Sequence, residues 1–294
     1  MEYLQVALTV KKSHAESLSV ILERAGALSV TVESANDEEI FDAAQPGDPM
    51  WILQRLTALF GSEFDIDVLS YVLKNHPEAN HVVVSKLPDQ DWERNWLEQF
   101  TPLQVGQALW VCPSWITPPD SSATNLIIDP GLAFGTGTHQ TTHLCLDYLS
   151  TMDLKDKLVI DFGCGSGILA IAAVKLGAEE AVAVDIDPKA IDATRSNAEI
   201  NNVSSKIHVG LPQDLDELMQ NRKSPLVIAN ILADTLIELK NVLLNIVSPD
   251  AILLLSGVLA TQVERVSSSF SPQFQFVARQ KDEWMLLEGQ SQLD

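Results

Sequence analysis

A glycine-rich turn between a strand pattern and a helix pattern constrains this chain more than any other feature. Residues 158–162 form a short apolar run, and glycines follow at 163, 165 and 167 before a helix predicted to reach Lys175. Glycines here let the backbone bend tightly and let a ligand approach the main chain. A dinucleotide-binding turn would carry its third glycine at position 168, where this chain has isoleucine. The turn therefore predicts a ligand site in an α/β fold and disfavours a nicotinamide cofactor.

Two acidic residues narrow the choice of cofactor. Asp161 precedes Gly163 and Gly165, and an acidic residue ahead of such glycines is typical of S-adenosylmethionine (SAM) methyltransferases. SAM has no pyrophosphate, so it does not need the dinucleotide fingerprint. We expect Asp161 to hold the cationic amino-acid end of SAM, directly or through water. Asp185 ends the next strand pattern, where a carboxylate accepts hydrogen bonds from ribose hydroxyls, as it also does in NAD enzymes.

Strand and helix patterns alternate along the second half of the chain. This alternation predicts an α/β fold with a doubly wound parallel sheet. The strands are predicted at 158–162, 181–185, 226–230 and 251–255, and two more lie within 273–288 around a turn near Asp282.

Asn230 ends one of these strands, and ligands bind beyond the carboxyl ends of strands in such sheets. Its amide oxygen can orient an incoming amine without adding charge, so Asn230 is our candidate catalytic residue. The alternative is a buried asparagine that only satisfies a loop.

The first 86 residues predict a smaller α/β domain of the ferredoxin-like type. Leu4, Val6, Leu8 and Val10 alternate as on one face of a strand, and Ser13 reads as the N-cap of a helix that ends at Gly26. The remaining predictions are strands over 27–33 and 81–84 and helices over 50–60 and 66–75.

Residues 87–120 predict a linker helix and a connector to a catalytic domain at 121–294. Trp92, Trp96 and Phe100 recur at every fourth position, which places them on one face of a helix. We interpret this face as packing against a neighbouring domain; the functional alternative is that Phe100 borders a ligand pocket.

A second glycine-rich segment runs from Asp129 to His143 and contains three glycines and four threonines. Such a loop is rich in donors and suited to cover a cofactor. His139 and His143 are four residues apart, but Gln140 stands where a zinc protease motif has glutamate, so no metal site is expected.

Charge and composition limit the partners. The 294 residues carry 40 acidic and 19 basic side chains, a net charge of −21. Such a surface repels phosphate backbones, so we expect no nucleic-acid binding; it favours a basic partner, or serves solubility alone. Three cysteines without CxxC spacing (Cys112, Cys145 and Cys164), no signal-peptide start and no apolar run of membrane length predict a cytoplasmic protein with no membrane contact.

Five segments together resemble one family, the bacterial methyltransferases of ribosomal protein L11 (PrmA). The matching segments are 91–100, 110–115, 129–142, 161–167 and 230–233. The resemblance implies a seven-stranded Rossmann-like SAM methyltransferase domain behind a substrate-recognition domain. It implies methylation of lysine ε-amines and of the N-terminal α-amine of a basic ribosomal protein, by an enzyme that we expect to be a monomer. It also implies cofactor contacts at Thr142, Gly163, Asp185 and Asn230.

One departure and three alternatives stay open at this point. The family often has Gly-Pro where this chain has Asp234-Thr235, which affects the shape of a loop. The first alternative is a methyltransferase of the same fold acting on another protein or small-molecule amine. Ile231-Leu232-Ala233 replaces the Pro-Pro-Tyr that glutamine-modifying enzymes carry after the asparagine. The second and third alternatives are an NAD-dependent oxidoreductase and a non-catalytic ribosome-associated module.

Overall fold

The computed structural model describes residues 3–35, 52–74, 76–87, 100–106, 109–129, 135 and 137–292. The chain divides into two compact units, Met1–Leu97 and Glu98–Asp294, and each is described by itself. The predicted tryptophan helix lies outside the described residues except for Phe100, and so do residues 130–134 and 136 of the second glycine-rich segment. No helix in the described parts of the chain is long and apolar enough to cross a membrane.

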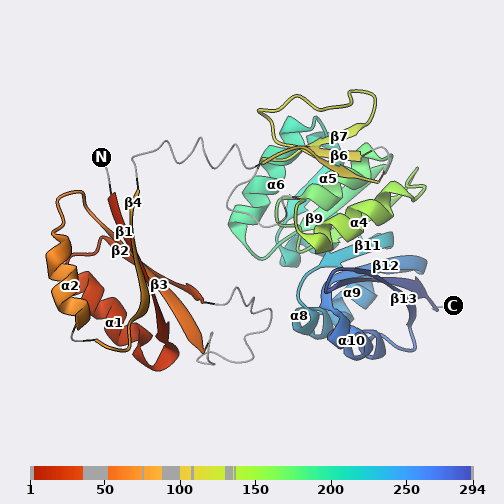
Figure 1. The fold of residues 1–294 in the computed structure, drawn as a ribbon. Helices are drawn as coiled ribbons and strands as arrows, with labels where there is room; N and C mark the ends of the chain where they lie inside the picture. The colour runs from red at the N-terminus through yellow and green to blue at the C-terminus, as the bar shows by residue number, and fades with distance from the viewer. Residues whose placement is uncertain are drawn as a thin grey trace. The chain divides into compact units, whose positions relative to one another are not determined.

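The first unit is a four-stranded antiparallel sheet with two helices on one face (Figure 1). Its elements are β1 (Tyr3–Lys11), α1 (Lys12–Arg24), β2 (Ser29–Ser34), β3 (Leu53–Phe60), α2 (Ile66–Lys74) and β4 (Asn80–Leu87). The sheet order is β2-β3-β1-β4. Val6, Leu8 and Val10 of β1 are buried against Leu18 and Leu22 of α1, which confirms the predicted alternation. The element order is compatible with a ferredoxin-like domain, which stays a prediction.

Two local predictions in this unit are wrong. Residues 53–60 form β3 instead of a helix, and every second side chain of this strand is buried. The strand lies between β1 and β2, so both of its edges are hydrogen-bonded to neighbouring strands. Ser13 does not cap α1, because the helix begins directly after β1 with Lys11 as its N-cap and no side-chain capping bond.

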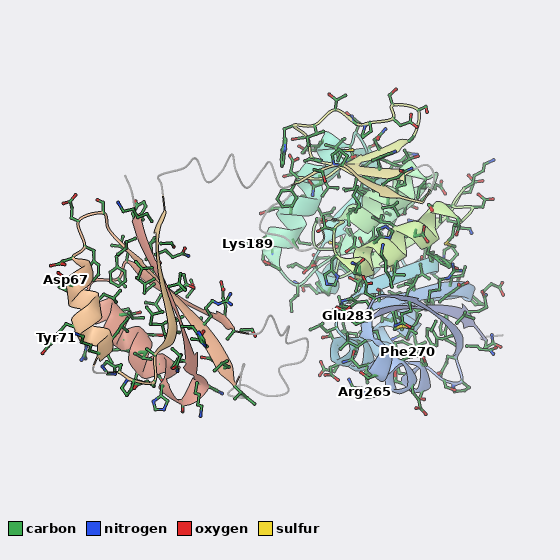
Figure 2. The ribbon with its side chains drawn as sticks, in the orientation of Figure 1. Asp67, Tyr71, Lys189, Arg265, Phe270 and Glu283 are labelled. Carbon is green, nitrogen blue, oxygen red and sulfur yellow. The ribbon has the colours of Figure 1, made fainter. Side chains whose placement is uncertain are left out.

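The sheet face opposite the helices carries no helix among the described residues of this unit. A shallow hollow on it is lined mainly by polar side chains, among them Thr9, Thr31, Glu33, Arg55, Thr57 and His81. On the helical side, Figure 2 shows Asp67 and Tyr71 on α2, and Tyr71 is 73% exposed. An antiparallel sheet commonly keeps one face in water in this way.

The second unit is built on a seven-stranded sheet, as predicted. Its strands are β8 (Leu158–Phe162), β9 (Glu180–Val184), β10 (Ile207–Gly210), β11 (Ser224–Asn230), β12 (Val247–Leu259), β13 (Phe274–Lys281) and β14 (Trp284–Ser291). They lie in the order β10-β9-β8-β11-β12-β14-β13. The first five are parallel, and β14 runs antiparallel to both β12 and β13.

Helices cover both faces of this sheet (Figure 1). The first face carries α4 (Gln140–Ser150), α5 (Ile168–Lys175) and α6 (Pro188–Ile200); the second carries α7 (Leu215–Leu218), α8 (Ala233–Glu238), α9 (Lys240–Ile246) and α10 (Val263–Ser269). Leu158, Ile160 and Phe162 join the core on the second face, where Phe270 is fully buried (Figure 2). Because side chains alternate along a strand, Asp161 points to the first face.

A small three-stranded sheet completes the second unit. It consists of β5 (Leu103–Val105), β6 (Leu109–Cys112) and β7 (Thr124–Ile127), with β6 in the centre. Asn201, the C-cap of α6, accepts a hydrogen bond from Ile127 N and donates one to Ile127 O, at 2.9 and 2.6 Å. The connector predicted for 87–120 thus contains two strands that belong to the second unit.

Candidate active site

The glycine turn after β8 is tied to the end of the neighbouring strand β9. Gly163 and Cys164 donate their backbone N–H groups to Val184 O, at 2.8 and 3.1 Å. The backbone of Gly163 has a φ of +78°, and an added Cβ there would lie 2.4 Å from Ile231 Cγ2. Both the turn and the close approach therefore require glycine at this position.

Asp185 holds this turn from the strand end. Its Oδ2 accepts a hydrogen bond from Gly165 N at 2.9 Å, and its Oδ1 accepts one from Asp187 N at 3.0 Å. A carboxylate has lone pairs to spare beyond these two bonds, so Asp185 can still accept from a ligand. Asp187 caps α6 by accepting from Lys189 N, as predicted.

Asp161 is 1% exposed at the base of the turn. Its Oδ2 accepts a hydrogen bond from Ala170 N in the first turn of α5, at 3.0 Å. Its Oδ1 is buried and has no hydrogen-bond partner among the described residues. Burial raises the pKa of Asp161 to about 7, and the nearby charge of Asp185 adds to the rise. The site thus contains a buried carboxyl oxygen that a cationic ligand would satisfy.

Asn230 and Thr142 meet at the carboxyl end of β11. Asn230 Nδ2 donates to Thr142 Oγ1 at 3.3 Å, and Thr142 lies fully buried in the first turn of α4. The Oδ1 of Asn230 is buried and has no partner among the described residues. The contact of Gly163 with Ile231, the residue after Asn230, joins this pair to the glycine turn.

Phe100 lines a separate small recess in the second unit. Thr101, Leu103, Val111, Pro113, Ile128 and Thr138 line it too, and Thr138 belongs to the second glycine-rich segment. Phe100 therefore lies in the same recess as one residue of that segment, Thr138. Its predicted role beside the cofactor stays a prediction.

The described end of the second glycine-rich segment is anchored to the site. Gly135 O accepts a hydrogen bond from Ser166 Oγ at 2.5 Å, and Ser166 belongs to the glycine turn. His139 is the N-cap of α4, since its side chain accepts from Thr141 N, and its ring lies 5.1 Å from that of Trp284. Within the described residues, no group of three or more His, Cys, Asp or Glu side chains is arranged to hold a metal ion.

Two buried polar residues of α6 complete the site and were missed by the sequence analysis. Thr194 Oγ1 donates to Gly165 O at 3.0 Å, and Asn197 Nδ2 donates to Ser166 O at 2.9 Å. Both therefore hold backbone carbonyls of the glycine turn. The signal was present: positions 194, 197 and 201 recur at helical spacing on the same face as Ala190 and Ala198, which makes a polar stripe on a buried face.

Comparisons with known proteins agree over the length of the chain. The family model for "Ribosomal protein L11 methyltransferase (PrmA)" matches residues 2–292. A ribosomal protein L11 methyltransferase of Escherichia coli is 44% identical over 293 residues, which is 98% of this chain and 99% of the relative. One of Pasteurella multocida is 43% identical over 299 residues, or 99% and 100% of the two chains. The crystal structure of a ribosomal protein L11 methylase from Lactobacillus delbrueckii subsp. bulgaricus has a TM-score of 0.59 at 30% identity and covers 65% of this chain and 99% of its own.

The sheet order, the glycine turn and the acidic residues at the ends of β8 and β9 define a Rossmann-like SAM-dependent methyltransferase. The buried Oδ1 of Asp161 and the spare lone pairs of Asp185 fit the cationic and hydroxyl groups of this cofactor. Because one family model spans nearly the whole chain and relatives share 43–44% of their residues with it, the chain belongs to the ribosomal protein L11 methyltransferase family, PrmA.

Proposed function

We propose that this enzyme methylates lysine ε-amines and the N-terminal α-amine of ribosomal protein L11. The relatives at 43–44% identity carry this protein in their names. The observation that carries the proposal is the orphaned Oδ1 of Asn230, a neutral acceptor at the carboxyl edge of the sheet. An amine nitrogen with an N–H to donate is the kind of group that would satisfy it.

Six residues would hold the cofactor in this proposal. They are Thr142, Asp161, Gly163, Gly165, Asp185 and Asn230, and Phe100 is the seventh candidate, at the neighbouring recess. Asp161 would bind the amino-acid end through its partnerless oxygen, and Asp185 would accept from the ribose hydroxyls. When bound, SAM supplies an electrophilic methyl group carried on a sulfonium.

Asn230 would orient the acceptor amine. Its Nδ2 donates to Thr142 Oγ1, which orients the amide, and its Oδ1, without a partner among the described residues, is left to accept from the amine. An N–H of the amine that donates to this oxygen leaves the nitrogen lone pair to point elsewhere, toward the methyl group. Such alignment of two reactants is a large part of what a site can contribute to a transfer of this kind.

The amine must be neutral before it reacts. A free α-amine titrates near 7.7–8.0, but a lysine ε-amine titrates near 10.4 and is almost fully protonated at neutral pH. Burial in the site disfavours the charged ammonium and lowers the lysine pKa. Asn230 assists because its neutral oxygen adds no negative charge that would hold the proton on the amine.

The first unit would recognise the substrate, as the predicted division into a recognition domain (1–86), a connector (87–120) and a catalytic domain (121–294) implies. Residues 1–85 carry 13 acidic and 5 basic side chains, which suits a basic ribosomal protein. The open face of its sheet offers Thr9, Thr31 and Thr57 as hydrogen-bonding groups around Glu33 and Arg55. Because a ribosomal protein is the proposed acceptor, we propose that the reaction takes place in the cytoplasm. We also propose a monomeric enzyme, and its net charge of −21 disfavours contact with RNA.

The experiment is methyl transfer from labelled SAM to purified ribosomal protein L11, with mass spectrometry to locate the methyl groups. Asn230→Ala should lower turnover about 100-fold, because the acceptor amine loses its alignment. Asn125→Ala is the matched control: Asn125 Oδ1 is also buried without a partner among the described residues, but its Nδ2 donates to Asp120 O and Ala123 O beside β7.

Two results would contradict the proposal. Label on another protein or on RNA, with none on ribosomal protein L11, would refute the substrate. Unchanged turnover in Asn230→Ala, with intact cofactor binding, would remove the catalytic role of the amide.

A further inference from the structure

Ile231 lies between two glycines, Gly163 in the turn after β8 and Gly257 in β12. On one side, its Cγ2 is placed 2.4 Å from where a Cβ of Gly163 would be. On the other side, its carbonyl oxygen and carbon are placed 2.4 and 2.8 Å from where a Cβ of Gly257 would be. Gly163 follows β8 and Gly257 lies in β12, the two strands that flank β11. The residue after Asn230 is therefore held from both neighbouring strands.

Neither glycine can be replaced at this packing distance without a shift. Gly163 and Gly257 have φ values of +78° and +81°, and the pairing of β12 with β14 shifts its register between Ser256 and Val258. The bulge at Gly257 brings its backbone against the backbone of Ile231. By contrast, Gly177 has a φ of +116° but nothing within 4 Å of an added Cβ, so it needs glycine for its conformation alone.

We propose that Ile231 is a positioning residue for Asn230, held in place by Gly163 and Gly257. Among the described residues, the Asn230 side chain makes one hydrogen bond, the 3.3 Å contact with Thr142, and this long bond leaves the position of the amide at the strand end weakly fixed. Ile231, packed against both glycines, supplies the missing constraint on the position of the Asn230 amide. This inference rests on the proposed role of Asn230 and adds how its oxygen is kept in register with the glycine turn.

The arrangement also joins the two halves of the site. Gly163 belongs to the turn that would hold the cofactor, and it contacts the Ile231 side chain. Asn230, which would hold the acceptor amine, directly precedes Ile231 in the chain. One residue thus sets the separation of the two reactants. A displacement of about 1 Å between reactants can cost about 100-fold in rate.

Two matched pairs of full-length variants test the inference. Gly257→Ala places a Cβ against the Ile231 backbone, and Gly177→Ala also puts an alanine at a positive φ but with no collision. Ile231→Ala removes Cγ2, and Ile231→Val keeps it. We expect Gly257→Ala and Ile231→Ala to lower kcat about 10- to 100-fold and to raise the Kd of SAM by a smaller factor, because Asn230 is one of six residues proposed to hold the cofactor. Gly177→Ala and Ile231→Val should keep kcat within about threefold of the parent.

A second readout does not depend on activity. The side-chain amide of Asn230 gives an NMR cross-peak that Asn230→Ala identifies by its loss. The peak should move in Gly257→Ala and Ile231→Ala and stay in place in the two control variants. An unmoved peak, or equal loss of kcat in both members of a pair, overturns the inference. If the peak moves as expected but Asn230→Ala turns over normally, the positioning stands and the proposed catalytic role of Asn230 fails.

Discussion

The two sheets of this protein differ in what covers them. The sheet of the first unit packs one face against α1 and α2 and leaves the other open, with a polar hollow across its strands. The sheet of the second unit is covered on both faces, and every residue of β8 is buried. Its polar groups gather at the strand ends, where two buried oxygens have no partner among the described residues. An open face suits recognition of another protein's surface, whereas a covered sheet leaves only its edge for a small ligand.

The largest effect should come from substitutions in the two hydrophobic cores, one in each unit. Leu56 in β3 and Leu236 in α8 are both fully buried, each in the core of its own unit. Leu56→Ala should cost about 2–5 kcal/mol of unfolding free energy, lower the methylation of ribosomal protein L11 and leave the Kd of SAM unchanged. Leu236→Ala should lower the methylation of ribosomal protein L11 and raise the Kd of SAM. Differential scanning calorimetry measures the stability of both variants, and titration with SAM measures their cofactor binding. A loss of SAM binding in Leu56→Ala would contradict the assignment of substrate recognition to the first unit and of cofactor binding to the second.

A smaller effect should come from Asp185 at the covered sheet's edge. Asp185→Asn keeps the shape of the side chain but removes the charge that strengthens its hydrogen bonds. We expect weaker SAM binding by about 1.5–3 kcal/mol, or about 10- to 150-fold in Kd, measured by isothermal titration calorimetry. Asp187→Asn is the control, because Asp187 caps α6 and has no assigned ligand contact. Equal losses of SAM affinity in both variants would mean that the start of α6 determines SAM binding and the carboxylate of Asp185 does not.

The pH dependence of Asp161 gives a third, more modest effect. Burial raises its pKa from 3.8 to about 7, so the folded chain without ligand holds this proton more tightly than the unfolded chain does. The stability that this provides is complete below about pH 4 and is lost as the pH rises through about 7. Asp161→Asn should therefore gain stability relative to the parent between pH 5 and about 8, as chemical unfolding would measure.

The same carboxyl predicts the opposite trend for SAM. An ionised Asp161 attracts the cationic end of the cofactor, so the affinity of the parent should rise between about pH 6 and 7.5, where the α-amine of a ligand stays largely protonated. The affinity of Asp161→Asn should be lower and nearly flat over this range. A parallel rise in both proteins would assign the pH dependence to another group.

The smallest effect concerns the open face of the first unit. If the excess of acidic groups in residues 1–85 guides a basic substrate, the KM for ribosomal protein L11 should rise with salt while the Kd of SAM changes little. Glu33→Gln should weaken substrate binding by less than about 1 kcal/mol, and Glu264→Gln on α10 should leave it unchanged. A KM that does not depend on salt would return the charge of this unit to a role in solubility.

The sequence predicted the second unit better than the first for a physical reason. Strand, glycine turn and helix follow one another locally from Leu158 to Lys175, so the positions of Asp161 and Gly163 could be read from a single segment. Residues 53–60 have no such local signal. Leu53, Leu56 and Leu59 recur at helical spacing, while Gln54, Leu56 and Phe60 occupy the buried face of a strand. Pairing with β1 and β2 decides between the two, and that information lies elsewhere in the chain.

Contacts between distant segments account for the rest of what was missed. Thr194 reaches the turn from 29 residues away, and Gly257 meets Ile231 only because β12 lies beside β11. Neither residue stands in a motif. The hydrogen bond of Asn230 with Thr142 spans 88 residues, and only the resemblance to the family brought both residues into one predicted site.

The position of β14 in the sheet determines when the second unit can finish folding during synthesis. This last strand in chain order lies between β12 and β13, and Leu286 and Leu287 in it are fully buried. The sheet cannot close until β14 has been synthesised, whereas all four strands of the first unit lie before residue 88. At about 5–20 residues per second, the first unit precedes the finished catalytic sheet by about 10–40 seconds. On a translating ribosome, the surface proposed for recognition is therefore present well before any capacity to transfer a methyl group.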